Sequence, residues 1–584
     1  MEPQISNEAK ARLLDHISHI YDDDVTPHVH AQLLGILERE LRVHAEGPKT
    51  VRSPLSEQSA ILIAYGDQVN EPGVPPLRTL TRIVDETAKG LITDIHILPF
   101  FPYSSDDGFS VIDYEAVDPT LGDWEDIARL TDRFGLMTDL VINHVSTQSA
   151  WFQGFLHGDE TYADYFIVVE EDADLSDVVR PRALPLLTAF DTAEGRRHVW
   201  TTFSADQIDL NYANPDVLLR MIEVLLTYVR RGATLVRLDA VAFLWKRIGS
   251  PCIHCEETHR IIKLMRTVLD VVGPQVLLIT ETNVPHDENI GYFGDGTDEA
   301  QLVYQFPLPP LVVDAFHNED ATSLTEWADA LEMPPGRATF FNFLASHDGI
   351  GLRPLEGIVP ASRVETMVER TQQNGGQVSH MLGQDGRETA YELNISYFDA
   401  LSDPNGAEPI DTQVRKFLTA QSIMLSLIGV PGIYFHSLFG SRSWPEGVSQ
   451  QGSPRGINRE KLPLDTLTTD LHNPASIRAQ VFSGYRDLLL ARSRNPAFHP
   501  RAPQRILTLD PRVFAILRGD ETSPPVLCLH NVSSESVALS LMPAFAELSR
   551  RLPCGGHSPG TVDPARLTLA PFETLWLTGV GTAK

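Results

Sequence analysis

Charged and polar side chains stand at the ends of several short apolar segments, where packing alone gives no reason for them. Two of them, Arg237 and Asp239, are two positions apart, so both would point to the same face of an extended strand. One such charge could belong to a structural ion pair, but polar residues at the ends of four segments together indicate a site. The residues are Asn143, His144, Arg237, Asp239, Glu281, His347 and Asp348.

The three carboxylates suggest a division of labour in glycosidic bond chemistry. Retaining enzymes use one carboxylate as nucleophile and a second carboxyl group as acid and base, roughly 5–5.5 Å apart. Asp239 has the cation Arg237 beside it, so we expect it to stay ionised and to act as the nucleophile. Glu281 would be the proton donor, which requires burial or a like-charged neighbour, and Asp348 would stabilise positive charge at the anomeric carbon.

Parallel strands that end at one rim would bring these residues together. Eight short runs rich in β-branched residues are mostly separated by helical patterns, such as 215–230 and 254–272. This alternation predicts an α/β fold with a parallel sheet, and eight strands predict a closed (β/α)8 TIM barrel. The expected strands are 60–65, 94–100, 137–144, 234–241, 276–282, 302–306, 339–346 and 430–436.

We expect the 584-residue chain to be divided into three parts. Apolar positions at helical spacing predict an N-terminal helical extension over 1–57. The barrel would occupy 58–494, with loop domains inserted after strands three and seven at about 145–215 and 349–412, where such loops shape active sites. From 495 to 584, short alternating runs separated by turns predict an antiparallel β domain.

The composition narrows the partners and the compartment. A formal net charge of −31 disfavours nucleic acid and anionic membranes as partners, so we expect small-molecule substrates. Four cysteines cannot supply a disulfide framework, no apolar run approaches the roughly 18 residues of a membrane span, and residues 1–20 contain no secretory apolar core. These features predict a soluble, cytoplasmic protein and do not indicate its oligomeric state.

Cys252 and Cys255, with His254 and His259 nearby, have the spacing of half a zinc site. A structural zinc site usually needs a second ligand pair at suitable spacing, and the other two cysteines lie far along the chain. We therefore expect no metal and no cofactor, and interpret the two cysteines as packing or pocket-lining residues.

Four segments resemble the signature regions of the α-amylase clan, in the same order along the chain. They are DLVINH at 139–144, VRLD at 236–239, ITE at 279–281 and ASHD at 345–348. The resemblance implies a (β/α)8 barrel with Asp239 as nucleophile, Glu281 as acid and base and Asp348 as stabiliser. It also implies that the sugar is bound by Arg237, His144 and His347.

Further segments resemble the sucrose phosphorylase subfamily. They are LPFFPYSSDDGF at 98–109, RPR at 180–182, QIDL at 207–210, YELN at 391–394 and GINR at 456–459. The resemblance implies a pocket for one glucose, with the ligands Asp106, Phe109, Gln207 and Arg459. It further implies that phosphate is bound by Arg182 and Tyr391, and a bidentate arginine suits that anion.

Differences from typical sucrose phosphorylases favour a neighbouring branch. Val179 replaces a usual tyrosine, the N-terminal extension is additional, and the segments at 434–440 and 458–461 are more similar to glucosylglycerate phosphorylases. This resemblance implies a retaining phosphorylase that transfers glucose reversibly between phosphate and D-glycerate through a covalent glucosyl-enzyme. An acceptor loop for the carboxylate could contain Arg370, His380 and Arg387.

Other reactions of the same chemistry stay open at this point. Sucrose, sucrose 6'-phosphate and glucosylglycerol phosphorylases differ from this reaction in the acceptor, and a related α-glucosidase would release glucose without phosphate. A non-catalytic relative would lack at least one of Asp239, Glu281 and Asp348, and all three are present.

Overall fold

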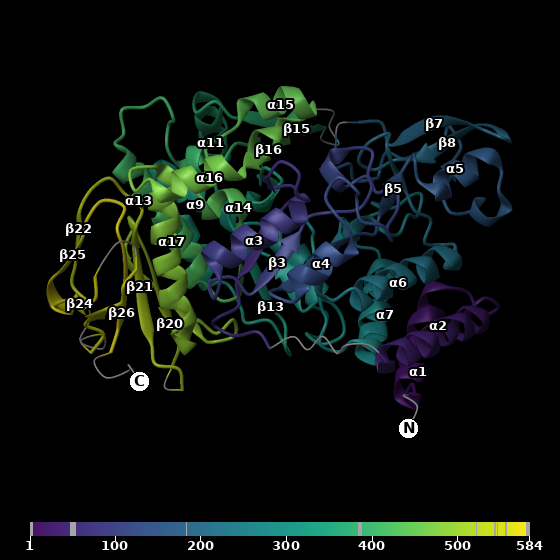
Figure 1. Ribbon diagram of the computed structural model, residues 1–584, viewed down its shortest axis with the longest axis horizontal. Helices are drawn as coiled ribbons and strands as arrows, with labels where there is room; N and C mark the ends of the chain where they lie inside the picture. Colours follow the sequence, from purple (N-terminus) through teal and green to yellow (C-terminus); the bar gives the residue numbers. More distant parts are fainter. Residues whose placement is uncertain are drawn as a thin grey trace.

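A closed barrel of eight parallel strands forms the centre of the molecule (Figure 1). The computed structural model describes residues 4–46, 54–182, 184–382, 388–520, 522–541, 545, 547–554 and 558–579. The predicted (β/α)8 barrel is confirmed, and each of its strands lies within or overlaps the segment predicted for it. In chain order the strands are β1 (Ile61–Ala64), β3 (Asp94–Ile97), β4 (Gly135–Val141), β10 (Ala233–Asp239), β11 (Leu277–Thr280), β12 (Leu302–Tyr304), β13 (Thr339–Phe343) and β17 (Val430–Tyr434).

Amphipathic helices surround the barrel. Helix α6 (Pro215–Arg230) shows how the sequence starts one: the Asn214 side chain accepts a hydrogen bond from the Asp216 amide, and Pro215 occupies the first helical position. No helix among the described residues is long and apolar enough to cross a membrane. The remaining helices outside the N-terminal extension and the two insertions are α3 (Pro76–Ala88), α4 (Trp124–Thr131), α7 (Glu256–Val272), α8 (His286–Ile290), α9 (Leu308–Asn318), α10 (Thr322–Asp329), α13 (Ile410–Ser426), α14 (Phe435–Leu438), α15 (Pro445–Gln451), α16 (Leu464–His472) and α17 (Ile477–Ser493).

Two insertions follow β4 and β13 and carry small sheets of their own. The first contains β5 (His144–Ser146), α5 (Ala150–His157), β6 (Val168–Val169), β7 (Leu187–Thr192), β8 (Gly195–Trp200) and β9 (Gln207–Asp209). The second contains β14 (Ile350–Gly351), α11 (Ala361–Gln373), β15 (Gln377–Leu382), β16 (Glu388–Asn394) and α12 (Tyr397–Leu401). Its three strands form an antiparallel sheet in the order β14-β16-β15.

The chain ends in antiparallel sheets, as predicted. The larger one is built around β19 (Gln504–Asp510), β20 (Val513–Arg518), β21 (Val526–Asn531) and β26 (Thr574–Thr578), and it also contains β23 (Arg550–Arg551) and β24 (Gly560–Thr561). A second pair is formed by β22 (Val537–Leu539) and β25 (Leu567–Leu569). A short parallel pair elsewhere joins β2 (Val69–Asn70) to β18 (Leu462–Pro463).

The N-terminal extension is a pair of helices, α1 (Asn7–Ile20) and α2 (Thr26–Glu46), that packs on α6 and α7 (Figure 1). Ser6 caps α1, and a buried stripe of Leu13, Ile17 and Ile20 follows helical spacing. The Tyr21 hydroxyl donates to the Tyr212 carbonyl at 2.9 Å, beyond the end of the stripe. The extension therefore covers the two helices that precede and follow β10 in the chain.

We expect Leu13→Ala to lower the melting temperature. Leu13 is fully buried in the main apolar core, and truncating such a side chain costs about 2–5 kcal/mol. Leu14→Ala is the matched control, because Leu14 is 40% exposed and the same change there should have little effect. Thermal unfolding followed by circular dichroism compares the two, and equal Tm values would show that the extension does not fold as part of the barrel unit.

Candidate active site

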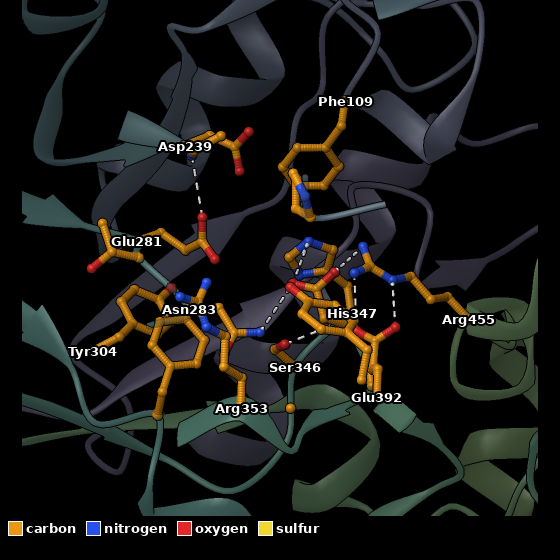
Figure 2. Close-up of a pocket in the computed structure, with 18 of the residues that line it drawn as sticks. Phe109, Asp239, Glu281, Asn283, Tyr304, Ser346, His347, Arg353, Glu392 and Arg455 are labelled. Atoms are coloured by element: carbon orange, nitrogen blue, oxygen red, sulfur yellow. Dashed lines mark hydrogen bonds and ion pairs between the residues drawn. The ribbon is translucent and has the colours of Figure 1, made fainter. Parts of the chain in front are cut away.

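A cavity lies at the C-terminal ends of the barrel strands, and both insertions contribute to its wall (Figure 2). Asp239 is the last residue of β10, Glu281 follows β11 directly, and Asp348 comes shortly after β13. Parallel strands end at the same rim, so residues far apart in the chain meet there. The predicted site residues that line the cavity are Asp106, Phe109, His144, Arg182, Gln207, Arg237, Asp239, Glu281, His347, Asp348 and Tyr391.

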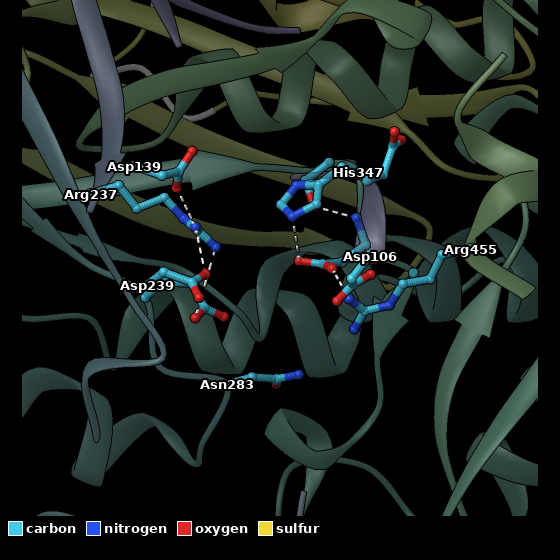
Figure 3. Close-up of polar contacts among 12 residues, drawn as sticks. Asp106, Asp139, Arg237, Asp239, Asn283, His347 and Arg455 are labelled. Carbon is cyan, nitrogen blue, oxygen red and sulfur yellow. Dashed lines mark hydrogen bonds and ion pairs between the residues drawn. The ribbon is translucent and has the colours of Figure 1, made fainter. Parts of the chain in front are cut away.

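Arg237 is the cation of the carboxylate pair (Figure 3). Its Nη1 donates to Asp239 Oδ1 at 2.8 Å and also to Asp139, while its Nη2 lies 3.8 Å from Glu281 Oε2. The amide of Ala240, the residue after Asp239, donates to Glu281 Oε2 at 3.2 Å. Ala240 has a φ of +51°, a left-handed turn that side chains other than glycine rarely adopt. The backbone thus turns sharply next to Asp239, and its Ala240 amide holds the Glu281 carboxylate close to Asp239.

Burial raises the pKa of Asp239 and of Glu281, each to about 7. The loss of solvation outweighs the attraction of Arg237, so the pKa of Asp239 is raised despite this neighbouring cation. Two adjacent carboxyl groups of this kind share one proton near neutral pH. Arg237 bonds Asp239 at 2.8 Å and reaches Glu281 at only 3.8 Å, so the geometry favours the charge on Asp239 and the proton on Glu281.

Asp348 has its own cation, Arg455. Burial would raise the pKa of Asp348, but the ion pair with Arg455 holds it well below its usual range. Arg455 also donates twice to Glu392, from Nη2 at 2.9 Å and from Nε at 3.2 Å. Figure 2 shows Arg455 reaching between Glu392 and the residues of the cavity. Asp348 is therefore a fixed negative charge in the pocket, unlike the Asp239 and Glu281 pair.

The expected sugar ligands form one wall of the cavity. The rings of Phe109 and His347 are stacked, with centroids 4.7 Å apart and an interplanar angle of 5°. The His144 Nε2 atom lies 2.8 Å from the Phe109 carbonyl oxygen, and Gln207 Nε2 lies 3.2 Å from His144 Nε2. An apolar ring face beside polar side chains suits a sugar, which offers C–H bonds on its faces and hydroxyls at its edge.

Arg459, which was predicted to be a direct glucose ligand, is buried next to the cavity. It is 1% exposed and does not line the cavity among the described residues. Its Nε donates to the His347 carbonyl at 2.9 Å, and its Nη1 lies 3.7 Å from Asp106 Oδ1. The structure places Arg459 behind Asp106 and His347, where it can hold both in position.

The two predicted phosphate ligands both lie in the part of the cavity wall that the insertions form. Arg182 and Tyr391 both line the cavity, and Asn283 Nδ2 donates to the Tyr391 hydroxyl at 3.2 Å. Burial raises the pKa of Tyr391, so the phenol keeps its proton and can donate to an anion. Of the expected acceptor loop, Arg387 lies outside the described residues, whereas Arg370 is exposed on α11 and, like His380, does not line the cavity.

The cysteine pair after β10 lies outside the cavity. Cys252 packs in a small apolar cluster with residues of the first insertion, and its Sγ donates to the Arg247 carbonyl at 3.2 Å. His254 and His259 are directed to Glu288 and Glu299 instead. Across the described residues, no three His, Cys, Asp or Glu side chains converge as a metal site would require.

Comparison with known proteins agrees with the barrel fold and points to one family within the α-amylase clan. Residues 88–349 match the α-amylase catalytic domain family. The chain is 48% identical to a glucosylglycerate phosphorylase of Spirochaeta thermophila, over 97% of this chain and 98% of that protein. It is 41% identical to a glucosylglycerate phosphorylase of Escherichia coli, over 97% of this chain and all of that one.

The chain belongs to the glucosylglycerate phosphorylase family. The match to these relatives runs almost from end to end, so it includes the helical extension and the C-terminal sheets as well as the barrel. In fold, the chain is similar to the crystal structure of sucrose 6F-phosphate phosphorylase from Thermoanaerobacter thermosaccharolyticum. That similarity has a TM-score of 0.72 at 23% identity, and it covers 88% of this chain and 100% of the other.

Sequence reasoning missed several residues that line this cavity. Arg455, Glu392 and Asn283 line the cavity, yet none was singled out from the sequence. A charge count could have pointed to Arg455, because three buried carboxylates around one arginine leave an excess of negative charge that needs a second cation. Arg455 stands one residue before the GINR segment, so the motif was recognised and its neighbour was overlooked.

Proposed function

We propose that the chain catalyses the reversible phosphorolysis of 2-O-α-D-glucosyl-D-glycerate to α-D-glucose 1-phosphate and D-glycerate. The main support is that one cavity contains two pairs of residues. Asp239 and Glu281 each have a pKa raised to about 7, and Arg182 and Tyr391 line the same cavity. The first pair suits glucosyl transfer and the second suits an anion. Nearly full-length relatives that bear the name glucosylglycerate phosphorylase support the choice of acceptor.

In the first step, Asp239 attacks the anomeric carbon while Glu281 gives its proton to the departing glycerate oxygen. A glucosyl ester on Asp239 and an ionised Glu281 result. Asp348, kept negative by Arg455, stabilises the positive charge that develops on the sugar ring. The wall formed by Phe109 and His347 would hold the sugar ring in position during this attack.

In the second step, after glycerate has departed, phosphate binds next to the anomeric carbon. Arg182 and Tyr391 bind it, and Glu281 takes the proton of the attacking phosphate oxygen as the ester to Asp239 breaks. Two inversions give net retention, so the product is the α-anomer of glucose 1-phosphate. An anion site beside the reacting carbon also favours phosphate over water as the second nucleophile.

Phosphate release in the reverse direction tests the acceptor. The enzyme is incubated with α-D-glucose 1-phosphate and, in separate reactions, D-glycerate, glycerol, fructose or fructose 6-phosphate. We expect the fastest phosphate release with D-glycerate. Release with fructose or fructose 6-phosphate but not with glycerate would overturn the proposal, and glucose formation at the same rate without any acceptor would indicate a hydrolase.

A further inference from the structure

The arginines that line the cavity fall into two kinds. Arg237 is paired with Asp139 and Asp239, and Arg455 with Asp348 and Glu392. Within the described part of the chain, no carboxylate lies within 4.0 Å of the guanidinium groups of the other two. These two are Arg182 and Arg353.

The backbone holds Arg353 rigidly beside the anion site. The Leu352 amide donates to the Tyr391 carbonyl at 2.9 Å, and Gly351 pairs with Glu392 in the sheet of β14 and β16. Arg353 then opens a short 3-10 helix whose next two residues, Pro354 and Leu355, are buried. Because the backbone at Arg353 is fixed before any ligand binds, little free energy of binding is lost in ordering it when Arg353 forms an ion pair.

Asn283 presents an unsatisfied group on the same side. Its Nδ2 donates to Tyr391, whereas its Oδ1 is buried and has no hydrogen-bond partner among the described residues. The amide packs against Gly351, where a Cβ would come within 2.9 Å of it. A buried acceptor without a partner is unfavourable, and a ligand hydroxyl would satisfy it.

Arg353 and Asn283 approach the cavity from the side of Glu281 (Figure 2). The oxygen that Glu281 protonates belongs to the acceptor, so the acceptor must lie on that side during transfer. A hydroxy acid carries a carboxylate next to its hydroxyls. Arg353 offers a free guanidinium for the carboxylate, and Asn283 offers a free carbonyl for a hydroxyl.

We infer that Arg353 binds the carboxylate of the acceptor and Asn283 one of its hydroxyls, which leaves Arg182 and Tyr391 to phosphate. This inference rests on the proposed function. It makes Arg353 the residue that separates anionic from neutral acceptors, such as D-glycerate from glycerol. Arg353 takes no part in forming or breaking the bond to the anomeric carbon.

Arg353→Gln tests the inference through two reactions of α-D-glucose 1-phosphate. With D-glycerate as acceptor, we expect the KM for glycerate to rise about 30-fold or more, because a charge-assisted contact is lost. With arsenate in place of an acceptor, glucose release should change less than about threefold, because that reaction uses the phosphate site. Arg353→Lys should restore part of the affinity for glycerate, and the preference over glycerol should shrink in the Gln variant.

Arg370→Gln is the matched control, since Arg370 is an exposed arginine of the same insertion and lies outside the cavity. It should leave both reactions unchanged. If Arg353→Gln keeps the normal KM for glycerate, or impairs arsenolysis as strongly, the inference is wrong and the proposed function stands. If the unaltered enzyme does not use D-glycerate at all, the proposed function fails, and the carboxylate assignment fails with it.

Discussion

Asp239→Asn is expected to lower turnover by about 10⁴-fold or more with every donor and acceptor, because an amide cannot form the glucosyl ester. The geometry supports this choice of nucleophile over Glu281, since Arg237 donates to Asp239 at 2.8 Å and so favours its ionised form. Turnover is measured as phosphate release from α-D-glucose 1-phosphate in the presence of D-glycerate. A variant within tenfold of the normal rate would disprove the nucleophile assignment.

The matched control for this variant is Asp314→Asn. Asp314 is also a buried aspartate beside an arginine, Arg363 at 3.3 Å, but it lies on α9 and does not line the cavity. We expect this control to change stability and leave kcat within about threefold, as substitutions outside a reacting site usually do. Equal losses of kcat in both variants would point to a folding defect rather than to lost chemistry.

Glu281→Gln is expected to have a different signature. Phosphorolysis of glucosylglycerate should fall about 10²- to 10⁴-fold, the usual contribution of a general acid. With α-glucosyl fluoride as donor, formation of the glucosyl-enzyme should be much less affected, because fluoride leaves without being protonated. Pre-steady-state fluoride release measures that step, and an equal loss with both donors would contradict the role of Glu281 as proton donor.

The same variant should change the pH profile of kcat/KM. Burial raises the pKa of Asp239 and Glu281 to about 7, and the active form carries one proton on the pair. Activity should therefore fall below neutral pH, where both groups are protonated, and above it, where both are ionised. Glutamine cannot lose a proton, so the alkaline fall should vanish from the Glu281→Gln profile while the acidic fall is retained.

The fold could be predicted from the sequence because its elements are locally consistent. The strand that ends at Asp239 is apolar except for Thr234 and the two functional residues Arg237 and Asp239, so the same few residues indicate both the strand and its functional end. The C-terminal sheets could be predicted equally well, since β21 and β26 lie within the range 495–584 expected to form an antiparallel β domain. Alternation of apolar residues and short turns defines such strands without help from distant contacts.

The electrostatics of the site could not be predicted in the same way. Burial decides the pKa of Asp239, and the depth of a side chain depends on residues contributed by the whole barrel. The roles of Arg455 and Arg459 likewise depend on how one loop is laid over the pocket: four positions apart, one reaches Asp348 and the other lies behind Asp106. Spacing along the chain does not distinguish these two outcomes.

The small sheet of β14, β15 and β16 has a consequence for redesign. Its strands carry Tyr391 and Glu392, and its first strand joins Asp348 to Arg353 within a few residues. By the proposed assignments, residues of glucosyl transfer, phosphate binding and acceptor binding are thus linked by this one antiparallel sheet. We expect acceptor preference to be exchanged most successfully by transplanting the segment from 348 to 394 as a unit, because piecemeal changes within it would shift groups that serve the chemistry itself.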